Sequence, residues 1–138
     1  MTAERINPAG LARPSGFSHA VSAMAARMVF LAGQTGVDRD GNVAEGGIVP
    51  QFERALGNLL TALAATAGQP SDLVSLTIYL TDMENYQAHG KEIGAVWRRL
   101  AGTDYPAMAA VGVTRLWRPE LLVEIQGIAV VGADGVRR

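Results

Sequence analysis

The sequence contains no cysteine, and only two of its 138 residues are histidine. Without cysteine the chain can form no disulfide, and it can supply neither a thiol nucleophile nor the ligands of an iron–sulfur cluster. Two isolated histidines are also a poor basis for a structural zinc site, which is built from several Cys or His side chains. We therefore predict that the protein binds no metal ion and needs no cofactor.

Long apolar runs and an excess of charge of either sign are missing too. The 12 Lys and Arg residues nearly balance the 13 Asp and Glu residues, which leaves a net charge of −1. Nucleic-acid binding needs a basic patch or stripe, so we expect no nucleic-acid partner. No apolar stretch approaches the ~20 residues that span a bilayer, and no secretory signal is visible. These absences predict a cytoplasmic protein with no membrane partner.

Apolar residues, in contrast, are plentiful and make up 49% of the chain. A chain of this length suits one domain with a single core. We predict an irregular N-terminal arm over residues 1–15, one domain over residues 16–132 and a C-terminal tail over residues 133–138. So high an apolar fraction in a short chain also favours an oligomer, in which more surface is buried.

Alternating and continuous apolar runs predict the strands. Residues 17–24 and 27–33 fit two strands, with Ala25 and Ala26 as the tight link of a hairpin. Residues 73–80 alternate between apolar and polar side chains, as a half-buried strand does. Residues 105–131 have the pattern of two long apolar strands joined by a short polar connection, which predicts a second hairpin.

Two amphipathic helices are expected between these strands. The apolar residues of 49–67 recur at the spacing of one helix face, and Gly68 follows as a suitable terminator. A second helix is expected to begin after Asp82, a good N-cap residue, and to end at Gly102. The order β-β-α-β-α-β-β predicts an α+β fold, one sheet with both helices on one face.

One carboxylate stands out, because Glu124 lies between Val123 and Ile125 in the most apolar part of the chain. Moving an ionised carboxylate into apolar surroundings costs several kcal/mol unless it is paired or changes its pKa. Strand periodicity places Glu124 on the same face as Gln126. That face can be exposed, can form a polar subunit interface, or can carry a ligand site; the pattern alone leaves these open.

Five segments, in this order and spacing, resemble the Rid (reactive intermediate deaminase), or YjgF, family. They are LAGQTGV at 31–37, ALGNL at 55–59, LVSLTIYLTD at 73–82, YPA at 105–107 and LVEIQGIAV at 122–130. The resemblance covers residues 16–131. It implies a chorismate-mutase-like α+β fold with a mixed sheet, assembled as a homotrimer with small-molecule clefts between the subunits.

The resemblance also implies a chemistry. The archetypal members hydrolyse reactive enamines and imines such as 2-aminoacrylate. In them an arginine directly after Pro-Ala grips the substrate carboxylate, because its planar fork makes a bidentate contact. A glutamate of the last strand positions the attacking water, and the matching residue of this chain is Glu124.

The chain departs from that pattern at every polar position except Glu124. The family's arginine, tyrosine, serine, asparagine and thiol positions are occupied by Met108, Phe17, Ala32, Gly90 and Ala110. The chain therefore resembles a subgroup that lacks the substrate-binding arginine. The candidate ligand-binding residues that the resemblance implies are Phe17, Ala32, Gly33, Gly90, Tyr105, Met108, Ala110, Trp117 and Arg118.

Two arginines near this segment could replace the missing one. Continuing the strand alternation beyond Met108 places Arg115 on the opposite face, which argues against it. Arg118 could take the role if its turn folds back over the cleft.

Three functions compete at this point. The first is hydrolysis of an imine, enamine or related metabolite other than 2-aminoacrylate, with Glu124 positioning water. The alternative is a non-catalytic trimer that binds a small apolar or aromatic metabolite at its subunit interfaces. An endoribonuclease ranks behind both, because the chain lacks a basic stripe and a pair of histidines placed for RNA cleavage.

Overall fold

The computed structural model describes residues 3–24 and 27–132. Its centre is a four-stranded sheet in the order β3, β6, β4, β5. The strands are β3 (Arg27–Thr35), β4 (Leu73–Leu80), β5 (Ala107–Gly112) and β6 (Val123–Val131). Strand β4 pairs in parallel with β5 and antiparallel with β6, so the sheet is mixed, as predicted.

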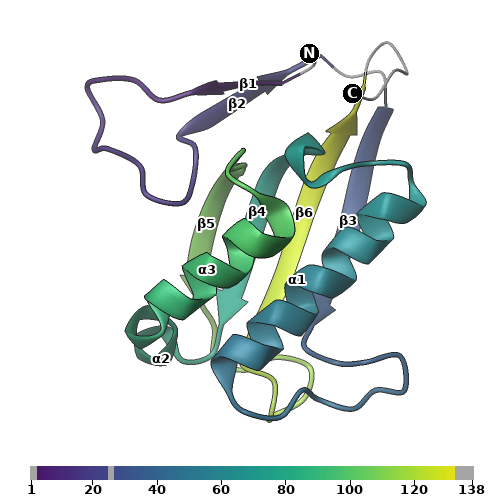
Figure 1. Ribbon diagram of the computed structural model, residues 1–138. Coiled ribbons are helices and arrows are strands. Elements are labelled where there is room, and N and C mark those ends of the chain that lie inside the picture. Colours follow the sequence, from purple (N-terminus) through teal and green to yellow (C-terminus); the bar gives the residue numbers. More distant parts are fainter. Residues whose placement is uncertain (1–2, 25–26, 133–138) are drawn as a thin grey trace.

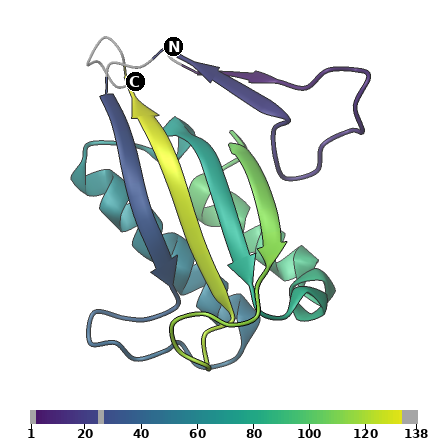
Figure 2. The same cartoon turned by 180° about the vertical axis from the view of Figure 1, so that it is seen from behind.

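The helices cover one face of this sheet and leave the other bare (Figures 1 and 2). They are α1 (Ile48–Ala65), α2 (Met83–Ala88) and α3 (Gly90–Ala101), with a short 3-10 turn at Pro70–Asp72 before β4. Along α1, Phe52, Leu56, Leu59 and Leu63 recur on one face and are almost fully buried. Their burial against the sheet confirms the helix that their spacing predicted.

The single second helix of the sequence prediction is in fact two. The Asp82 carboxylate caps the first piece by accepting a hydrogen bond from the Asn85 N–H at 3.0 Å, as expected of an N-cap. At His89 the backbone leaves the helical region, with φ −107° and ψ 19°. Helix α2 therefore ends at Ala88, and α3 starts afresh at Gly90.

The two strands expected within residues 105–131 do not form a hairpin. Strand β4 lies between β5 and β6 and pairs with both of them. The alternation along β6 is as predicted, because Val123, Ile125 and Ala129 are fully buried beneath the helices while Glu124 is half-buried and Gln126 exposed.

The N-terminal segment is more ordered than predicted. Strand β1 (Ala3–Ile6) pairs with β2 (Ala20–Ala23) in a separate antiparallel two-stranded sheet beyond the end of the main sheet (Figure 1). Arg5 fixes this unit by donating to the backbone carbonyls of Ser71 at 2.8 Å and Tyr105 at 3.2 Å. The partner of β2 is thus β1 and not β3. The expected hairpin link at residues 25–26 and the tail at 133–138 lie outside the described residues.

Candidate functional site

Glu124 lies on the bare face of the sheet. Its register partners are Thr35 of β3 and Tyr79 of β4, and residues paired across strands point to the same side. Tyr79 does not bond to it, since the Tyr79 hydroxyl donates to Gln126 Oε1 at 3.1 Å. Among the described residues, no side chain or backbone group donates a hydrogen bond to the Glu124 carboxylate. The carboxylate is therefore available to water or a ligand.

A β-bulge and a glycine position this carboxylate. Strand β3 advances from Leu31 to Gln34 while β6 retreats only from Gly127 to Ile125, so β3 carries an extra residue at this point. The bulge brings Gly33 beneath the Glu124 side chain. A Cβ added at Gly33 would overlap Glu124 Oε2 and lie 2.8 Å from its Cδ. Only glycine leaves room for the carboxylate where it now lies.

Glu124 and Gly33 line an open cavity of about 810 Å³, together with Thr35, Arg115, Leu116 and Trp117. The last three come from the loop of residues 113–122, which joins β5 to β6. The Trp117 side chain is 88% exposed, so it offers a free aromatic surface beside the carboxylate. The cavity thus combines the Glu124 carboxylate, the Arg115 guanidinium and an apolar wall formed by Leu116 and Trp117. This composition suits a small molecule that carries both a polar and an apolar part.

The loop of residues 113–122 is held in place by Gln51 and Arg118. The buried Gln51 side chain donates to the Glu120 carbonyl at 3.1 Å and accepts from the Leu122 N–H at 2.8 Å. Arg118 donates to Glu120 Oε2 at 3.0 and 2.6 Å and to the Gly41 carbonyl at 2.7 Å. The Glu120 backbone N–H and the Arg118 guanidinium hold the pKa of the Glu120 carboxyl below its usual value.

Arg118 is therefore a structural anchor in the single chain. It lines neither the Glu124 cavity nor the Met108 cavity described next. The guanidinium faces the turn at Gly41 instead of folding back over a cleft.

Met108 lines a second, more enclosed cavity of about 330 Å³ between β5 and the helices α2 and α3. Gly90, Tyr86, Trp97 and Tyr105 also line it. The rings of Trp97 and Tyr105 stack with their centroids 6.2 Å apart. Burial raises the pKa of the Tyr86 hydroxyl, so this group stays neutral well beyond neutral pH. The lining combines aromatic and apolar side chains with one cation, Arg98, and no carboxylate contributes to it.

The two cavities lie on opposite sides of the sheet. Met108 pairs with Leu76 of β4, whose side chain is buried beneath the helices, whereas Glu124 pairs with Tyr79 on the bare face. Within one chain, Glu124 and Met108 therefore cannot line the same pocket. The residues that the sequence grouped as one site form two separate half-sites.

Comparison with known proteins places this geometry in a family. Residues 9–131 match the family model described as Endoribonuclease L-PSP. The chain belongs to the Rid/YjgF family. A RutC family protein of Pyrococcus horikoshii is 32% identical over 114 residues, which are 82% of this chain and 85% of that protein. A 2-iminobutanoate/2-iminopropanoate deaminase of Capra hircus is 31% identical over 107 residues, which are 77% of this chain and 74% of that protein.

The structural likeness is stronger still. The crystal structure of YyfB, a Rid family protein of unknown function from Yersinia pestis, superposes with a TM-score of 0.85 at 32% identity, covering 95% of this chain and all of that one (100%). The predicted Rid/YjgF membership and the α+β fold are thereby confirmed.

The remaining residues that the Rid/YjgF resemblance implied lie around the two half-sites. Ala32 is exposed in the bulge beside Gly33. Ala110 is exposed on β5 and pairs with Ile78, which places it on the same side as Met108. The rings of Phe17 and His19 pack edge-on with their centroids 5.0 Å apart. Phe17 is not one of the residues that line either cavity.

The N-terminal segment nevertheless reaches the Met108 cavity. Ser15 and Gly16 contribute to its lining. The next residue but one, Ser18, donates to the Tyr105 carbonyl at 2.6 Å and to the Pro106 carbonyl at 3.0 Å. The two Ser18 bonds thus tie the entrance of β5 to residues 15–18, where the sequence predicts the end of the arm and the start of the first strand.

Sequence reasoning missed Arg115. The alternation argument assumed that β5 continues to residue 115, but the strand ends at Gly112. Beyond that residue the two-residue period no longer applies, and the loop carries Arg115 into the Glu124 cavity. The signal that could have found it is Gly112 itself, which favours the end of a strand.

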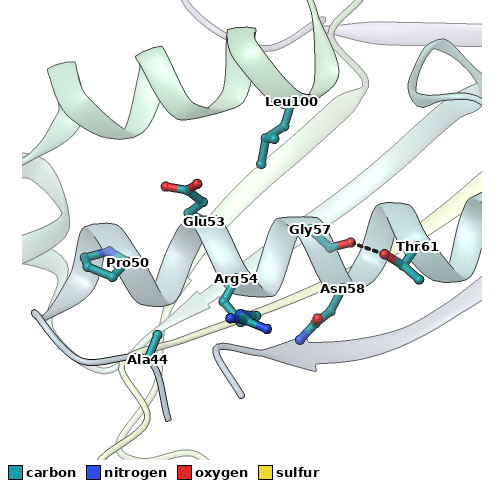
Figure 3. A pocket seen from close by; sticks show the side chains of 8 residues that line it. All are labelled: Ala44, Pro50, Glu53, Arg54, Gly57, Asn58, Thr61 and Leu100. Atoms are coloured by element: carbon teal, nitrogen blue, oxygen red, sulfur yellow. Dashed lines mark hydrogen bonds between the residues drawn. The ribbon is translucent and has the colours of Figure 1, made fainter. Parts of the chain in front are cut away.

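A third hollow lies on the outer side of α1 and contains none of the predicted residues (Figure 3). Its polar side chains largely serve the fold. Asn58 donates to the backbone carbonyls of Thr35 at 3.1 Å and Val37 at 2.8 Å, and Glu53 pairs with Arg99 at 3.1 Å. This hollow therefore offers less free chemistry than the Glu124 cavity.

Two further structural findings concern the described part of the chain as a whole. No helix in residues 3–24 and 27–132 has the length and apolar character that crossing a membrane requires. In the same ranges, His, Asp and Glu side chains do not gather in groups of three or more that could hold a metal ion.

Proposed function

We propose that this protein hydrolyses an imine, enamine or related metabolite other than 2-aminoacrylate, in clefts that two copies of the chain complete within a homotrimer. The observation that carries the proposal is the seating of the Glu124 carboxylate over Gly33, without an internal partner and facing an open cavity. A carboxylate kept in a partly buried strand position without a structural partner favours a functional role.

The chemistry that this arrangement supports is addition of water to a C=N bond. Glu124 holds a water molecule and accepts one of its protons as the oxygen attacks the imine carbon. The nitrogen takes up a proton as the C=N π bond breaks, which gives a carbinolamine. Collapse of the carbinolamine releases ammonia, or an amine, and leaves a carbonyl product. The 2-iminobutanoate/2-iminopropanoate deaminase relative supports this class of reaction.

Met108 supports the exclusion of 2-aminoacrylate. Where the archetypal members of the family are expected to carry an arginine, this chain offers a thioether, in a cavity that aromatic and apolar side chains line together with Arg98 of α3. A small carboxylated enamine would lose a bidentate, charge-assisted contact there, which costs on the order of 2–5 kcal/mol. A larger substrate with apolar surface suits the Met108 cavity better.

The trimer is supported by the exposed apolar side chains on the bare face of the sheet. Phe30 is 72% and Met28 52% exposed on β3, and Val111 is 40% exposed on β5. Exposed apolar groups on an uncovered sheet are typical of an interface between subunits. Assembly through this face would also let the Glu124 half-site of one copy approach another copy.

The test follows ammonia release, with spontaneous hydrolysis measured in parallel, from imines generated in situ from a panel of amino acids by an amino-acid oxidase and from 2-aminoacrylate generated in situ by enzymatic dehydration of serine. Wild type should accelerate the release for substrates with large apolar side chains and leave 2-aminoacrylate at its spontaneous rate. Glu124→Gln should lower the enzymatic rate about 10²-fold or more. Glu92→Gln, an exposed carboxylate on α3, is the matched control and should behave as wild type. Equal rates for Glu124→Gln and wild type on every substrate turned over would exclude this mechanism.

A second function is favoured by the Met108 cavity. Its enclosure and aromatic lining suit a non-catalytic trimer that captures a small apolar or aromatic metabolite. Calorimetric screening of such compounds discriminates the two proposals. Saturable binding to a protein that accelerates no imine hydrolysis favours capture, and turnover that depends on Glu124 favours the hydrolase.

The family description Endoribonuclease L-PSP adds RNA cleavage as a weaker candidate. Both histidine rings are engaged with backbone carbonyls, His19 with Ala12 at 2.6 Å and His89 with Asn85 at 2.9 Å. A general acid–base pair of histidines is thus not available for RNA, and the net charge of −1 gives no electrostatic attraction. Salt-dependent RNA binding and cleavage would reverse this ranking.

A further inference from the structure

Arg115 is the cation of the Glu124 cavity. It lies in the loop of residues 113–122, is exposed, and lines the same cavity as Glu124 and Trp117. The ion pairs among the described residues join Arg99 to Glu53 and Arg118 to Glu120, so the Arg115 guanidinium is not neutralised by a carboxylate of the chain. A positive charge thus stands free within the cavity that holds an unpartnered negative one.

The loop itself orients this guanidinium. Arg115 Nε donates to the Leu116 carbonyl at 3.1 Å, and Nη2 donates to the Trp117 carbonyl at 3.3 Å. Both bonds use the edge of the guanidinium that Nε and Nη2 share. The opposite edge, formed by the Nη1 and Nη2 N–H groups, keeps its fork of donors, and Nη1 bonds to nothing else in the part of the chain that the structure describes. This fork matches the two oxygens of a carboxylate.

We infer that Arg115 is the anion-recognition residue of this protein. It binds the carboxylate of a planar 2-imino or 2-oxo acid end-on, while Trp117 covers the apolar side chain of that acid. The inference rests on the proposed function and names the substrate class of the same site. The recognising cation has thus moved from the strand position that Met108 occupies to the loop after β5.

The charges of the cavity explain why such a residue is needed. Glu124 alone would repel an anionic substrate, because two like charges in a partly desolvated site disfavour each other. Arg115 offsets that repulsion and turns the carboxylate of the substrate away from Glu124. The C=N bond then faces the water that Glu124 holds. The bonds to the Leu116 and Trp117 carbonyls reduce the freedom that Arg115 loses on binding.

The specificity should follow from the same three side chains. Trp117 is 88% exposed and can stack on an aromatic ring, whereas a methyl group would leave most of its surface uncovered. An aromatic 2-oxo acid should therefore bind more tightly than pyruvate, and its neutral ester should bind more weakly than the acid.

The experiment measures calorimetric binding of phenylpyruvate, of its methyl ester and of pyruvate to the assembled wild-type protein at low ionic strength. Wild type should bind phenylpyruvate at least about 10-fold more tightly than the ester. Arg115→Gln should weaken phenylpyruvate binding by about 10- to 100-fold, the effect of losing hydrogen bonds to a charged group, and should change ester binding by less than about twofold. Arg115→Lys should restore only part of the affinity, because a single ammonium cannot form the bidentate contact. Arg39→Gln removes the same charge from an exposed turn that lines neither site cavity, and should match wild type.

Two outcomes overturn the inference. One is undiminished phenylpyruvate binding by Arg115→Gln, and the other is a wild-type protein that binds the acid no better than the ester or binds neither. Circular dichroism and the Tm of each variant check that the fold is retained.

The fate of the proposed hydrolase is read separately from imine turnover. Binding that depends on Arg115, without turnover, supports the role of Arg115 in carboxylate recognition and excludes the proposed hydrolysis. Turnover that needs Glu124 but is unchanged in Arg115→Gln supports the proposed hydrolysis and excludes the role of Arg115 in carboxylate recognition.

Discussion

The contact between Gly33 and Glu124 gives a prediction in which activity and stability change in opposite directions. Replacing Gly33 by alanine adds one methyl group in the bulge of β3, at the place where the Glu124 carboxylate now lies. The φ of Gly33 is outside the left-handed region, so alanine can adopt its backbone conformation. The cost of the substitution therefore falls on the carboxylate and not on the main chain.

The size of the displacement follows from the geometry. The Glu124 Cδ must retreat from 2.8 Å to an ordinary contact with the new Cβ, a shift of about 1 Å. A shift of about 1 Å in a reacting group lowers a rate about 10²-fold, which corresponds to about 2.7 kcal/mol of activation free energy. Meanwhile alanine restricts the unfolded chain, which stabilises the protein by about 0.4–1 kcal/mol minus the cost of moving Glu124.

The assay compares kcat for imine hydrolysis with the free energy of unfolding in urea, for wild type and Gly33→Ala. Gly57→Ala is the matched control, because a Cβ there meets nothing within 4 Å and lies in the interior of α1. It should raise stability by about 0.5–1 kcal/mol and leave kcat unchanged. Wild-type kcat in Gly33→Ala, together with a large loss in Glu124→Gln, would show that the position of the carboxylate over Gly33 does not matter.

Three further predictions concern assembly, the loop after β5 and pH. Phe30→Glu places a charge on the bare face of the sheet, so sedimentation velocity should show a smaller species than wild type; an unchanged species would place the interface elsewhere. Gln51→Leu leaves the Glu120 carbonyl and the Leu122 N–H without their partner, which should cost about 2–3 kcal/mol in urea unfolding, and a loss below about 0.5 kcal/mol would contradict it. Burial raises the pKa of Tyr86 above the ordinary 10.0, so the unfolded state ionises first and stability should fall as pH rises beyond 10.0. Tyr86→Phe should fall less steeply over that range, and an equal slope would assign the loss to other groups.

Local patterns predicted the parts of the fold that depend on local physics. The burial of Phe52, Leu56 and Leu59 is the direct result of their helical spacing. The alternation around Glu124 likewise gave the correct face of β6, because strand parity is a property of consecutive residues.

Pairing between strands could not be predicted in the same way. The hairpin expected within residues 105–131 was wrong because β4, which precedes both strands in sequence, lies between them. Strand order depends on contacts between distant segments, and nothing in the polar connection encodes it. Strand β1 was not predicted for a related reason. Its four residues form a strand only by pairing with β2, which lies more than ten residues later in the sequence.

The candidate site was predicted as a set of residues and not as a geometry. Glu124 and Gly33 were both named from the sequence, but their contact depends on the bulge between Leu31 and Gln34. Arg115 was rejected because the end of β5 at Gly112 was not anticipated. The division of the site between two sides of the sheet follows from strand register, which a resemblance to a family does not specify by itself.

That division has a genetic and biochemical consequence. If clefts form between copies, one chain supplies Glu124 to a cleft and a neighbouring chain supplies the Met108 cavity. A substitution at Glu124 and a substitution at Met108 then affect the parts supplied by different chains. If Met108→Trp abolishes activity as Glu124→Gln is expected to do, mixing the two kinds of chain and allowing subunits to exchange should restore about a quarter of the clefts to wild-type composition. Two alleles that each abolish activity could therefore complement one another in the same cell.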